Sequence, residues 1–281
     1  MQIKHLIITR LMISWNAQQS LSDIEQYPNM QKAQQRLNSR INIVNNFYIP
    51  AINSQTNDQF ENIFLIDRLH KDLDYSGFHF YKLKNCKILC EDSHRTLDPH
   101  LAQFYTQNPL TEQEKDNGFK TIKMVDGTEQ DIQILSASAS SDKYQTGFHN
   151  EAQNYVTKEY SDTDFIVTTR LDTDDAIQKN HIQNIQDVVY DKKRSMFIDH
   201  RSVLCAQVRN YLPPQIKTFK KFSYGGSRGT MMLSTTFRPN EFKQYNCYRA
   251  GHTSMCGKFE VNHRHRIEKL GGLYLHWRGK M

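Results

Sequence analysis

The run FENIFLID, from Phe60 to Asp67, decides the class of fold. It is apolar through Ile66 and then ends in an acid, which is typical of a buried strand. The preceding segment, residues 31–56, has apolar side chains at helical spacing, with Pro50 expected to bend or end the helix. KHLIITRLMI, residues 4–13, has the composition of an earlier strand. Strand, helix and strand in this order predict a βαβ unit and a parallel sheet.

The same kind of pattern continues along the chain. Further strands are predicted at residues 86–92, 163–171 and 194–205, and helices at residues 150–160 and 175–190. Residues 91–147 are mostly polar and contain Asp126-Gly127 between two strand-like halves, which predicts an inserted β-hairpin. We therefore expect an α/β fold with a mixed, mostly parallel sheet flanked by helices. We expect a single domain over residues 1–281.

Length and composition limit the class of protein and the compartment in which it is expected. A length of 281 residues suits one large or two small domains, and 11% aromatic residues argue against disorder. HLIITRLMI, residues 5–13, is too short to span a bilayer and lacks a cleavage site for a signal peptide. The five cysteines show no paired Cys-x-x-Cys spacing, so we expect no disulfide framework, no zinc site and a reduced cytoplasmic setting.

Charge is divided unevenly along the chain. Residues 1–175 hold 17 Lys and Arg against 24 Asp and Glu, a net charge of −7, whereas residues 176–281 hold 19 against 6, a net charge of +13. One interpretation is a solvated basic face. The others are a phosphate-bearing ligand, an anionic membrane surface or nucleic acid.

The clearest candidate for a functional site is a cluster of three acids, Asp172, Asp174 and Asp175. They directly follow the predicted apolar strand at residues 163–171. In open α/β sheets, ligands bind at the carboxyl ends of strands. On an extended segment Asp172 and Asp174 would point the same way, and two close carboxylates call for a cation between them. Mg²⁺ and Mn²⁺ favour such oxygen ligands. The alternative is helix capping, which would account for one of the acids, such as Asp174.

Three segments together resemble a known family. They are VTTRLDTDDAI at residues 167–177, LIITR at residues 6–10 and the block at residues 48–67, with Ala51 where a serine is common. The late LYLHW, which holds His276, is similar to a C-terminal histidine segment of the same family. This is a bacterial rhamnosyltransferase family of GT-A glycosyltransferases, related to glycosyltransferase family 2. The resemblance implies a GT-A fold and a nucleotide-sugar donor.

The resemblance also implies a set of ligand contacts. Asp172 and Asp174 would hold Mn²⁺ or Mg²⁺ against the donor diphosphate, with Asp175 close by. His276 would be a further metal ligand, its alternative being a structural histidine beside Trp277. The residues implied to contact the nucleotide or its phosphates are Thr9, Arg10, Asp67 and Arg170, together with Asp172. Asp67, at a strand end, has an equal alternative as a turn residue.

An inverting transfer needs a general base that deprotonates the acceptor hydroxyl. Only six acids follow Asp175. Asp199, on a predicted strand, is the first choice, and Glu260 is the second. His252 is a third candidate, with a structural role as its alternative.

The basic part of the chain suits an anionic partner. Its arginines are candidates to meet diphosphate, an anionic glycan, a lipid-linked acceptor or the membrane surface; they are Arg201, Arg209, Arg228, Arg249, Arg264, Arg266 and Arg278. The dense stretch His263–Arg266 is expected to be a solvated loop. Ser223–Thr230 is either a loop that closes over the donor or a set of simple turns.

The sequence thus favours a metal-dependent, inverting glycosyltransferase. Its donor would be a nucleotide-diphosphate sugar, its acceptor a glycan or lipid-linked glycan of a bacterial capsule or O-antigen, and its location cytoplasmic or peripheral at the inner membrane face. Two other classes stay open: a non-catalytic basic module that binds anionic glycan or nucleic acid, and a metal-dependent nucleotidyltransferase. No nucleic-acid-binding motif supports the former, and no glycine-rich phosphate loop follows the first strand to support the latter.

Overall fold

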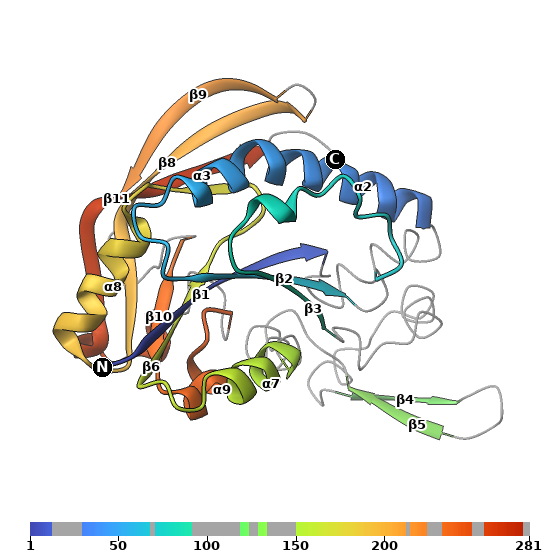
Figure 1. The fold of residues 1–281 in the computed structure, drawn as a ribbon. Helices are drawn as coiled ribbons and strands as arrows, with labels where there is room; N and C mark the ends of the chain where they lie inside the picture. Colours follow the sequence, from blue (N-terminus) through green and yellow to red (C-terminus); the bar gives the residue numbers. More distant parts are fainter. Residues whose placement is uncertain are drawn as a thin grey trace.

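A mixed β-sheet forms the centre of the molecule (Figure 1). The computed structural model describes residues 1–12, 30–67, 71–91, 119–123, 129–133, 150–211, 214–223, 232–248 and 256–277. Among these residues, nine strands form one sheet in the order β3-β2-β1-β6-β10-β8-β11-β7, with β9 paired to β8. The α/β class predicted from the sequence is confirmed.

The first half of the sheet is parallel. It contains β1 (Ile3–Met12), β2 (Glu61–Asp67), β3 (Cys86–Glu91) and β6 (Phe165–Arg170). The chain runs outward from β1 to β2 and β3, and then returns to place β6 on the other side of β1. The order of strands therefore reverses between β1 and β6, and such a switch point is where α/β sheets bind ligands at the carboxyl ends of their strands.

The second half of the sheet contains long and antiparallel strands. Its members are β7 (Asp175–Ile177), β8 (Met196–Tyr211), β9 (Pro214–Ser223), β10 (Ser234–Phe237) and β11 (Arg264–Trp277). Strand β10 runs antiparallel to both β6 and β8, whereas β11 runs parallel to β8. Because β11 begins at Arg264, the expectation of a solvated loop at His263–Arg266 was wrong.

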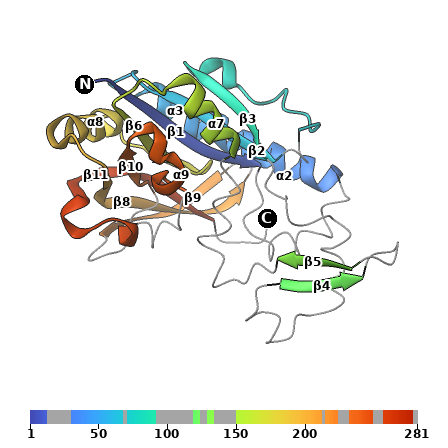
Figure 2. The same cartoon turned by 90° about the horizontal axis from the view of Figure 1, so that it is seen from below.

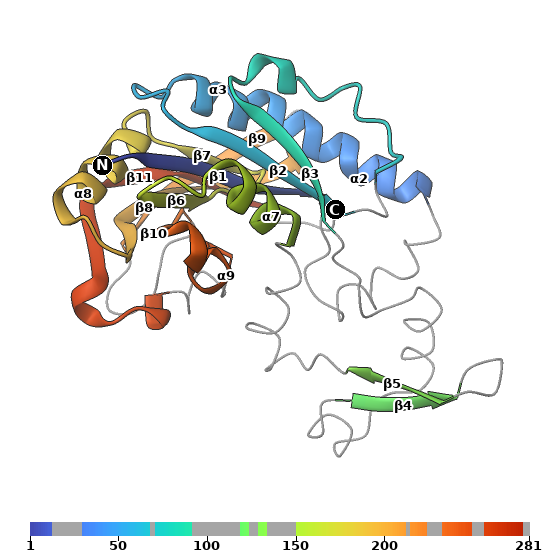
Figure 3. The same cartoon turned by 60° about the horizontal axis from the view of Figure 1, so that its bottom comes forward.

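Helices cover both faces of the parallel half (Figures 1 and 3). Helix α2 (Met30–Ile43), a π-helical turn (Val44–Tyr48) and α3 (Ile49–Asn53) pack on one face. Pro50 lies in the first turn of α3, where it has no hydrogen bond to break, so the chain stays helical through it. Tyr48, at the end of the π-helical turn, is fully buried.

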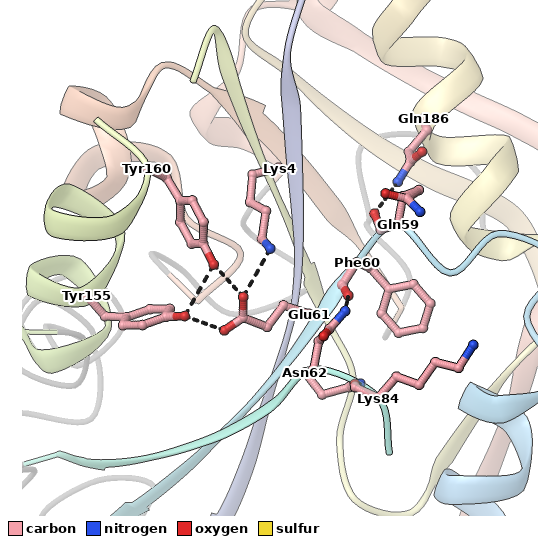
Figure 4. Close-up of polar contacts among 10 residues, drawn as sticks. Lys4, Gln59, Phe60, Glu61, Asn62, Lys84, Tyr155, Tyr160 and Gln186 are labelled. Atoms are coloured by element: carbon pink, nitrogen blue, oxygen red, sulfur yellow. Dashed lines mark hydrogen bonds and ion pairs between the residues drawn. The ribbon is translucent and has the colours of Figure 1, made fainter. Parts of the chain in front are cut away.

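The opposite face carries α7 (Asn150–Glu159) and the short α9 (Phe242–Tyr245), as the view from below shows (Figure 2). Helix α7 is joined to the sheet through Glu61 of β2, a buried carboxylate (Figure 4). The hydroxyls of Tyr155 and Tyr160 donate to its two oxygens, and Lys4 of β1 lies 3.1 Å from one of them. This network satisfies a charge that would otherwise be costly to bury.

The inserted hairpin is confirmed, with β4 (Phe119–Lys123) antiparallel to β5 (Glu129–Gln133). The Asp126-Gly127 turn itself lies outside the described residues. All five cysteines are free thiols. None of the described helices is long and apolar enough to cross a membrane.

Candidate functional site

The three acids form a tight turn between two strands. The backbone N–H of Asp175 donates to the carbonyl of Asp172 at 3.0 Å, and β7 begins at Asp175 itself. The expectation of an extended segment leading into a helix was therefore wrong. Helix α8 (His181–Lys192) starts six residues later, with Asn180 at its N-cap position, so none of the acids caps it. We call residues 172–175 the acid turn.

Asp172 is held by two arginines at the switch point. The Arg10 guanidinium donates to Oδ1 of Asp172 at 3.1 Å, and that of Arg170 donates to Oδ2 at 3.2 Å. Arg10 lies near the carboxyl end of β1 and Arg170 ends β6, so the adjacent strands deliver one guanidinium to each carboxylate oxygen. Both arginines are at least nine-tenths buried, which strengthens such charge-assisted bonds.

Tyr248 completes this group from the C-terminal part of the chain. Its ring centroid lies 4.6 Å from the guanidinium carbon of Arg10 and 4.7 Å from that of Arg170. Its hydroxyl donates to the Ile8 carbonyl at 3.0 Å and lies 3.5 Å from Asp172. Tyr248 therefore fixes both cations by cation–π contact.

Asp175 is the buried one of the three acids. Its side chain is fully buried, and neither carboxylate oxygen has a hydrogen-bond partner within the described part of the chain. Burial, and then the neighbouring charges of Asp174 and Asp172, raise the pKa of this carboxyl well above its ordinary value. Asp175 is therefore biased toward its uncharged form unless a cation approaches.

Arg40 of helix α2 lies near the acid turn, and Arg36 is one helical turn away from it on the same helix. Arg40 donates to the carbonyl of Leu11 at 2.5 Å, next to Arg10 on β1. Its pKa is lowered to about 10 by burial and by Arg36, while Asp174 acts in the opposite direction. Sequence reasoning missed this pair. The signal that could have found it is their spacing of four residues, which places two arginines on one side of a helix.

Asp199 lies on the same face of the sheet as Arg170. Ser234 of β10 pairs with Thr169 of β6 on one side and with Ile198 of β8 on the other. Because both pairings are antiparallel, the next residues of β6 and β8, Arg170 and Asp199, also lie level with each other, two strands or about 10 Å apart. Asp199 is 1% exposed and accepts from Arg266 at 3.0 and 3.2 Å. A carboxylate bound to a guanidinium in this bidentate way is a weak base, so the contact favours a structural role.

The other predicted residues are placed as follows. Thr9 is buried and shares a hydrogen bond of 2.8 Å with the Tyr48 hydroxyl, on the face opposite Arg10. Glu260 is exposed. Asp67 ends β2, and its backbone pairs with Glu91, but its side chain lies outside the described part of the structure.

The side chains of the two histidine candidates, His252 and His276, lie outside the described part of the structure. His252 lies outside the described residues. The backbone of His276 belongs to β11, two residues beyond Tyr274, which pairs with Asp175. The register thus carries His276 toward the acid turn, whereas its side chain is not among the described ones.

A divalent cation could find ligands at the acid turn. Within the described residues, no group of three or more His, Cys, Asp or Glu side chains is arranged to hold a metal ion. Mg²⁺ and Mn²⁺ in nucleotide sites commonly need only one or two carboxylates, since phosphate oxygens and water supply the rest. The buried, unpartnered carboxyl of Asp175 beside Asp174 and Asp172 fits such an ion.

The chain has only distant similarity to known proteins. No family model and no curated protein sequence matches it. Among solved structures it is similar to S. aureus TarS 1–349, alone (8% identity, TM-score 0.39) and in complex with UDP-GlcNAc (9%, 0.41), and to longer S. aureus TarS (8%, 0.39). The matches cover 98–100% of this chain but only 60%, 60% and 37% of those chains. Similarity at this level says nothing about substrate or catalytic residues.

Proposed function

We propose that this protein is a glycosyltransferase that moves a sugar from a nucleotide-sugar donor to a glycan or lipid-linked acceptor in bacterial surface polysaccharide synthesis. One observation carries the proposal. Arg10, Asp172 and Arg170 meet at the carboxyl ends of β1 and β6, where the strand order reverses. This is the position at which α/β sheets bind nucleotides. The Thr-Arg-Leu-Asp-x-Asp-Asp string, which resembles a rhamnosyltransferase family, supports the choice of a sugar nucleotide.

The chemistry of transfer fits the charges at this position. Breaking a bond between sugar and diphosphate leaves negative charge on the departing nucleotide, and fixed positive groups stabilise that charge. Arg10 and Arg170 are held in place by Asp172 and by the ring of Tyr248, so they require little reorganisation when the charge develops. Preorganisation of this kind is a major source of catalysis in buried polar sites.

We propose Mn²⁺ or Mg²⁺ as the cofactor, held by Asp174 and Asp172 with Asp175 beside them. A carboxylate has about four lone-pair sites, so Asp172 can retain both arginines and still offer an oxygen. The ion would neutralise charge on the diphosphate. The base of an inverting reaction is proposed among Glu260, Asp199 and His252. Glu260 is exposed, whereas Asp199 would first have to leave Arg266.

The experiment measures donor hydrolysis and thermal shift with a panel of nucleotide sugars that includes a rhamnose donor, in Mn²⁺, Mg²⁺ or EDTA. Wild type is compared with Asp174→Asn and with Asp187→Asn. Asp187 is an exposed acid on α8, bonded only to Gln183 among the described side chains, and serves as the matched control. We expect metal-dependent hydrolysis that falls roughly 10²-fold in Asp174→Asn and is unchanged in Asp187→Asn.

Other outcomes separate the alternatives. Equal binding of all polyanions, with no hydrolysis and no effect of metal or of Asp174→Asn, would indicate the non-catalytic binding module. Release of pyrophosphate from nucleoside triphosphates would indicate a nucleotidyltransferase. Either result would overturn the proposed function.

A further inference from the structure

Exposed apolar side chains gather at one edge of the sheet, on β3 and on the short 3-10 helix that precedes it (Phe80–Lys82). Among the described strands, β3 is the last in the sheet order on this side (Figure 3). Six large hydrophobic side chains are exposed in the described part of the chain, and three of them fall within nine residues. They are Phe80, Tyr81 and Ile88, which are 43%, 70% and 37% exposed. We call residues 80–88 the edge patch.

The apolar side chains of the edge patch are supported by the core. Ile88 of β3 is the register partner of Phe64 on β2, so the two side chains point to the same face of the sheet. The ring of Phe64 lies 5.0 Å from that of Phe78, which in turn lies 5.8 Å from that of Phe80. A line of aromatic contacts therefore leads from the core to the surface on the face that Ile88 shares, and Tyr81 follows directly in the chain.

The edge patch is basic within the acidic part of the chain. Residues 1–175 have a net charge of −7, yet residues 75–90 contain three lysines and no Asp or Glu. All three lysines are exposed: Lys82, Lys84 and Lys87. Lys84 forms an ion pair of 3.3 Å with Asp58, but both side chains are more than half exposed, and such pairs hold little energy. Positive charge therefore surrounds the exposed apolar groups.

This combination selects the kind of partner. The ammonium of Lys82 lies 5.9 Å from the ring centroid of Tyr81, so a ring and a cation are presented together. At the surface of an anionic bilayer, aromatic rings sit at the level of the headgroups, and lysines extend to the phosphates. A soluble anionic polymer would satisfy the lysines but leave Phe80 and Ile88 in water. A second copy packed on the same patch would bring like charges together.

We propose that the edge patch docks the protein on an anionic lipid surface. The contact is peripheral and reversible, because it combines a small apolar area with a few cations. The inference goes beyond the proposed function and does not rest on it, since lipid binding needs neither a donor nor a metal ion. It also places the contact in the acidic part of the chain, away from the arginines that the sequence offered for such a surface.

The test measures sedimentation of the full chain with phosphatidylcholine vesicles, with or without phosphatidylglycerol. We expect wild type to bind the anionic vesicles and to dissociate in about 1 M salt, where charges are screened beyond about 3 Å. Lys82→Gln should weaken binding roughly fivefold, because one lysine no longer meets the anionic surface. Tyr81→Ser should weaken it roughly tenfold, because its ring no longer leaves water.

The matched controls are Tyr190→Ser and Lys192→Gln. Both residues belong to α8, and their side chains are exposed as well. Neither control should change vesicle binding. An equal loss in these variants would mean a general effect of surface composition and would overturn the inference.

Three other results would also overturn it. The first is that wild type does not bind anionic vesicles, and the second is that the double variant Tyr81→Ser, Lys82→Gln binds them as well as wild type does. The third is that the double variant loses binding to a soluble anionic polysaccharide, or loses self-association, while wild type ignores vesicles. Thermal melts show whether the double variant folds. If it does not, Lys87→Gln carries the same test, with the same expected loss as Lys82→Gln.

Discussion

Tyr248 shows how one residue can organise a charged site. Its ring lies against both arginines that hold Asp172, and its hydroxyl is anchored on the backbone of β1. The ring and the hydroxyl make separable contributions. The hydroxyl bond is an ordinary neutral hydrogen bond, worth about 1 kcal/mol, whereas each cation–π contact adds roughly 0.5–2 kcal/mol when desolvated.

We therefore expect Tyr248→Leu to destabilise the protein more than Tyr248→Phe does. Tyr248→Phe keeps the ring and should cost about 1 kcal/mol, and Tyr248→Leu should cost roughly 2–4 kcal/mol because the arginines also lose their support. Urea unfolding of both variants measures the difference. Tyr190→Leu, at an exposed tyrosine of α8, should change the free energy of unfolding by less than about 0.5 kcal/mol. Equal losses in the two Tyr248 variants would mean that the ring contacts contribute nothing.

For individual residues, the local sequence identified a site residue where a polar side chain directly follows a strand. Asp172 was named from its place after an apolar run, whereas Arg10 and Arg170 were implied by the family resemblance, and the structure brings these three together. Arg40 and Tyr248 could not be named in this way. They reach the site only through the packing of α2 and of the segment after α9, and nothing local in the sequence encodes those contacts.

Among the elements, β7 depends on a glycine of its neighbour β11. Gly272 pairs with Ile177, and a Cβ built on Gly272 would lie 2.2 Å from the Ala176 carbonyl oxygen and 2.6 Å from the Met232 sulfur. The backbone of β7 cannot yield without moving the acid turn, because β7 begins at Asp175.

Gly272→Ala is accordingly expected to cost about 3 kcal/mol or more, at the upper end of the range for overpacking. It should also weaken nucleotide-sugar binding, since it displaces the acid turn. Gly257→Ala is the matched control, because its Cβ would meet nothing within 4 Å. Thermal melts of the two variants decide the matter. Identical melting temperatures would show that β7 can shift freely.

Three buried histidines link α8, β8 and β1. The rings of His181 and His200 are stacked with centroids 4.6 Å apart, and their Nδ1 atoms donate to the carbonyls of Gly271 and Lys269. His5 bonds to Thr169 through Nε2 at 2.7 Å. Burial lowers the pKa of His5 to about 3 and that of His200 to about 4. Burial, and then the neighbouring His200, hold the pKa of His181 well below its ordinary value.

These shifts predict acid sensitivity. Because the folded-state pKa values lie below the unfolded value of about 6.5, the unfolded chain binds more protons below that pH. The stabilising contribution is complete above pH 6.5 and is lost as the pH falls toward 4. Each histidine should remove about 1.4 kcal/mol per pH unit in that window. Urea unfolding between pH 4.5 and 7.5 measures the slope of the free energy of unfolding against pH.

The variant His200→Asn keeps a donor for the Lys269 carbonyl and should reduce the slope by about one histidine equivalent. His79→Asn, at a half-buried histidine outside this group, should leave it unchanged. A slope that is the same in all three proteins would contradict the assignment to the buried histidines.

Most elements were predicted correctly because their patterns are strong. The parallel strands are short apolar runs, and α2 and α7 show clear helical spacing. The failure at residues 175–190 has a physical cause. Asp-Ala-Ile was assigned to the helix by its spacing, but its backbone hydrogen bonds go to β11, nearly 100 residues away in the sequence. A three-residue strand defined by a distant partner leaves no local signal.

The fold has no structural boundary at the point where the chain changes from acidic to basic. The boundary between the acidic and basic parts at residue 175 falls within β7. Strand β10, from the basic part, lies between β6 and β8 and joins the two halves of the sheet. The site itself takes Arg10 and Asp172 from one part and Tyr248 from the other.

A fragment of residues 1–175 is therefore expected not to fold. It would leave one edge of β6 unpaired and would expose Thr168 and Thr169, whose hydroxyls bond to Thr235 and Ser234 of β10 at 2.8 and 2.6 Å. It would also lose Phe237 and Phe242 from the core cluster beneath α7. Circular dichroism during heating should show no cooperative transition for the fragment.

The matched control removes residues that the sheet does not need. Replacing residues 119–133 with a short Gly-Ser linker deletes β4 and β5, which form a separate sheet among the described strands. We expect that protein to melt cooperatively, like wild type, because loop length changes the free energy of folding only slowly. A cooperative melt of the 1–175 fragment would instead mean that the acidic part is a domain of its own and that β10 only docks on it. The arginine–carboxylate site would then have to persist without the ring of Tyr248.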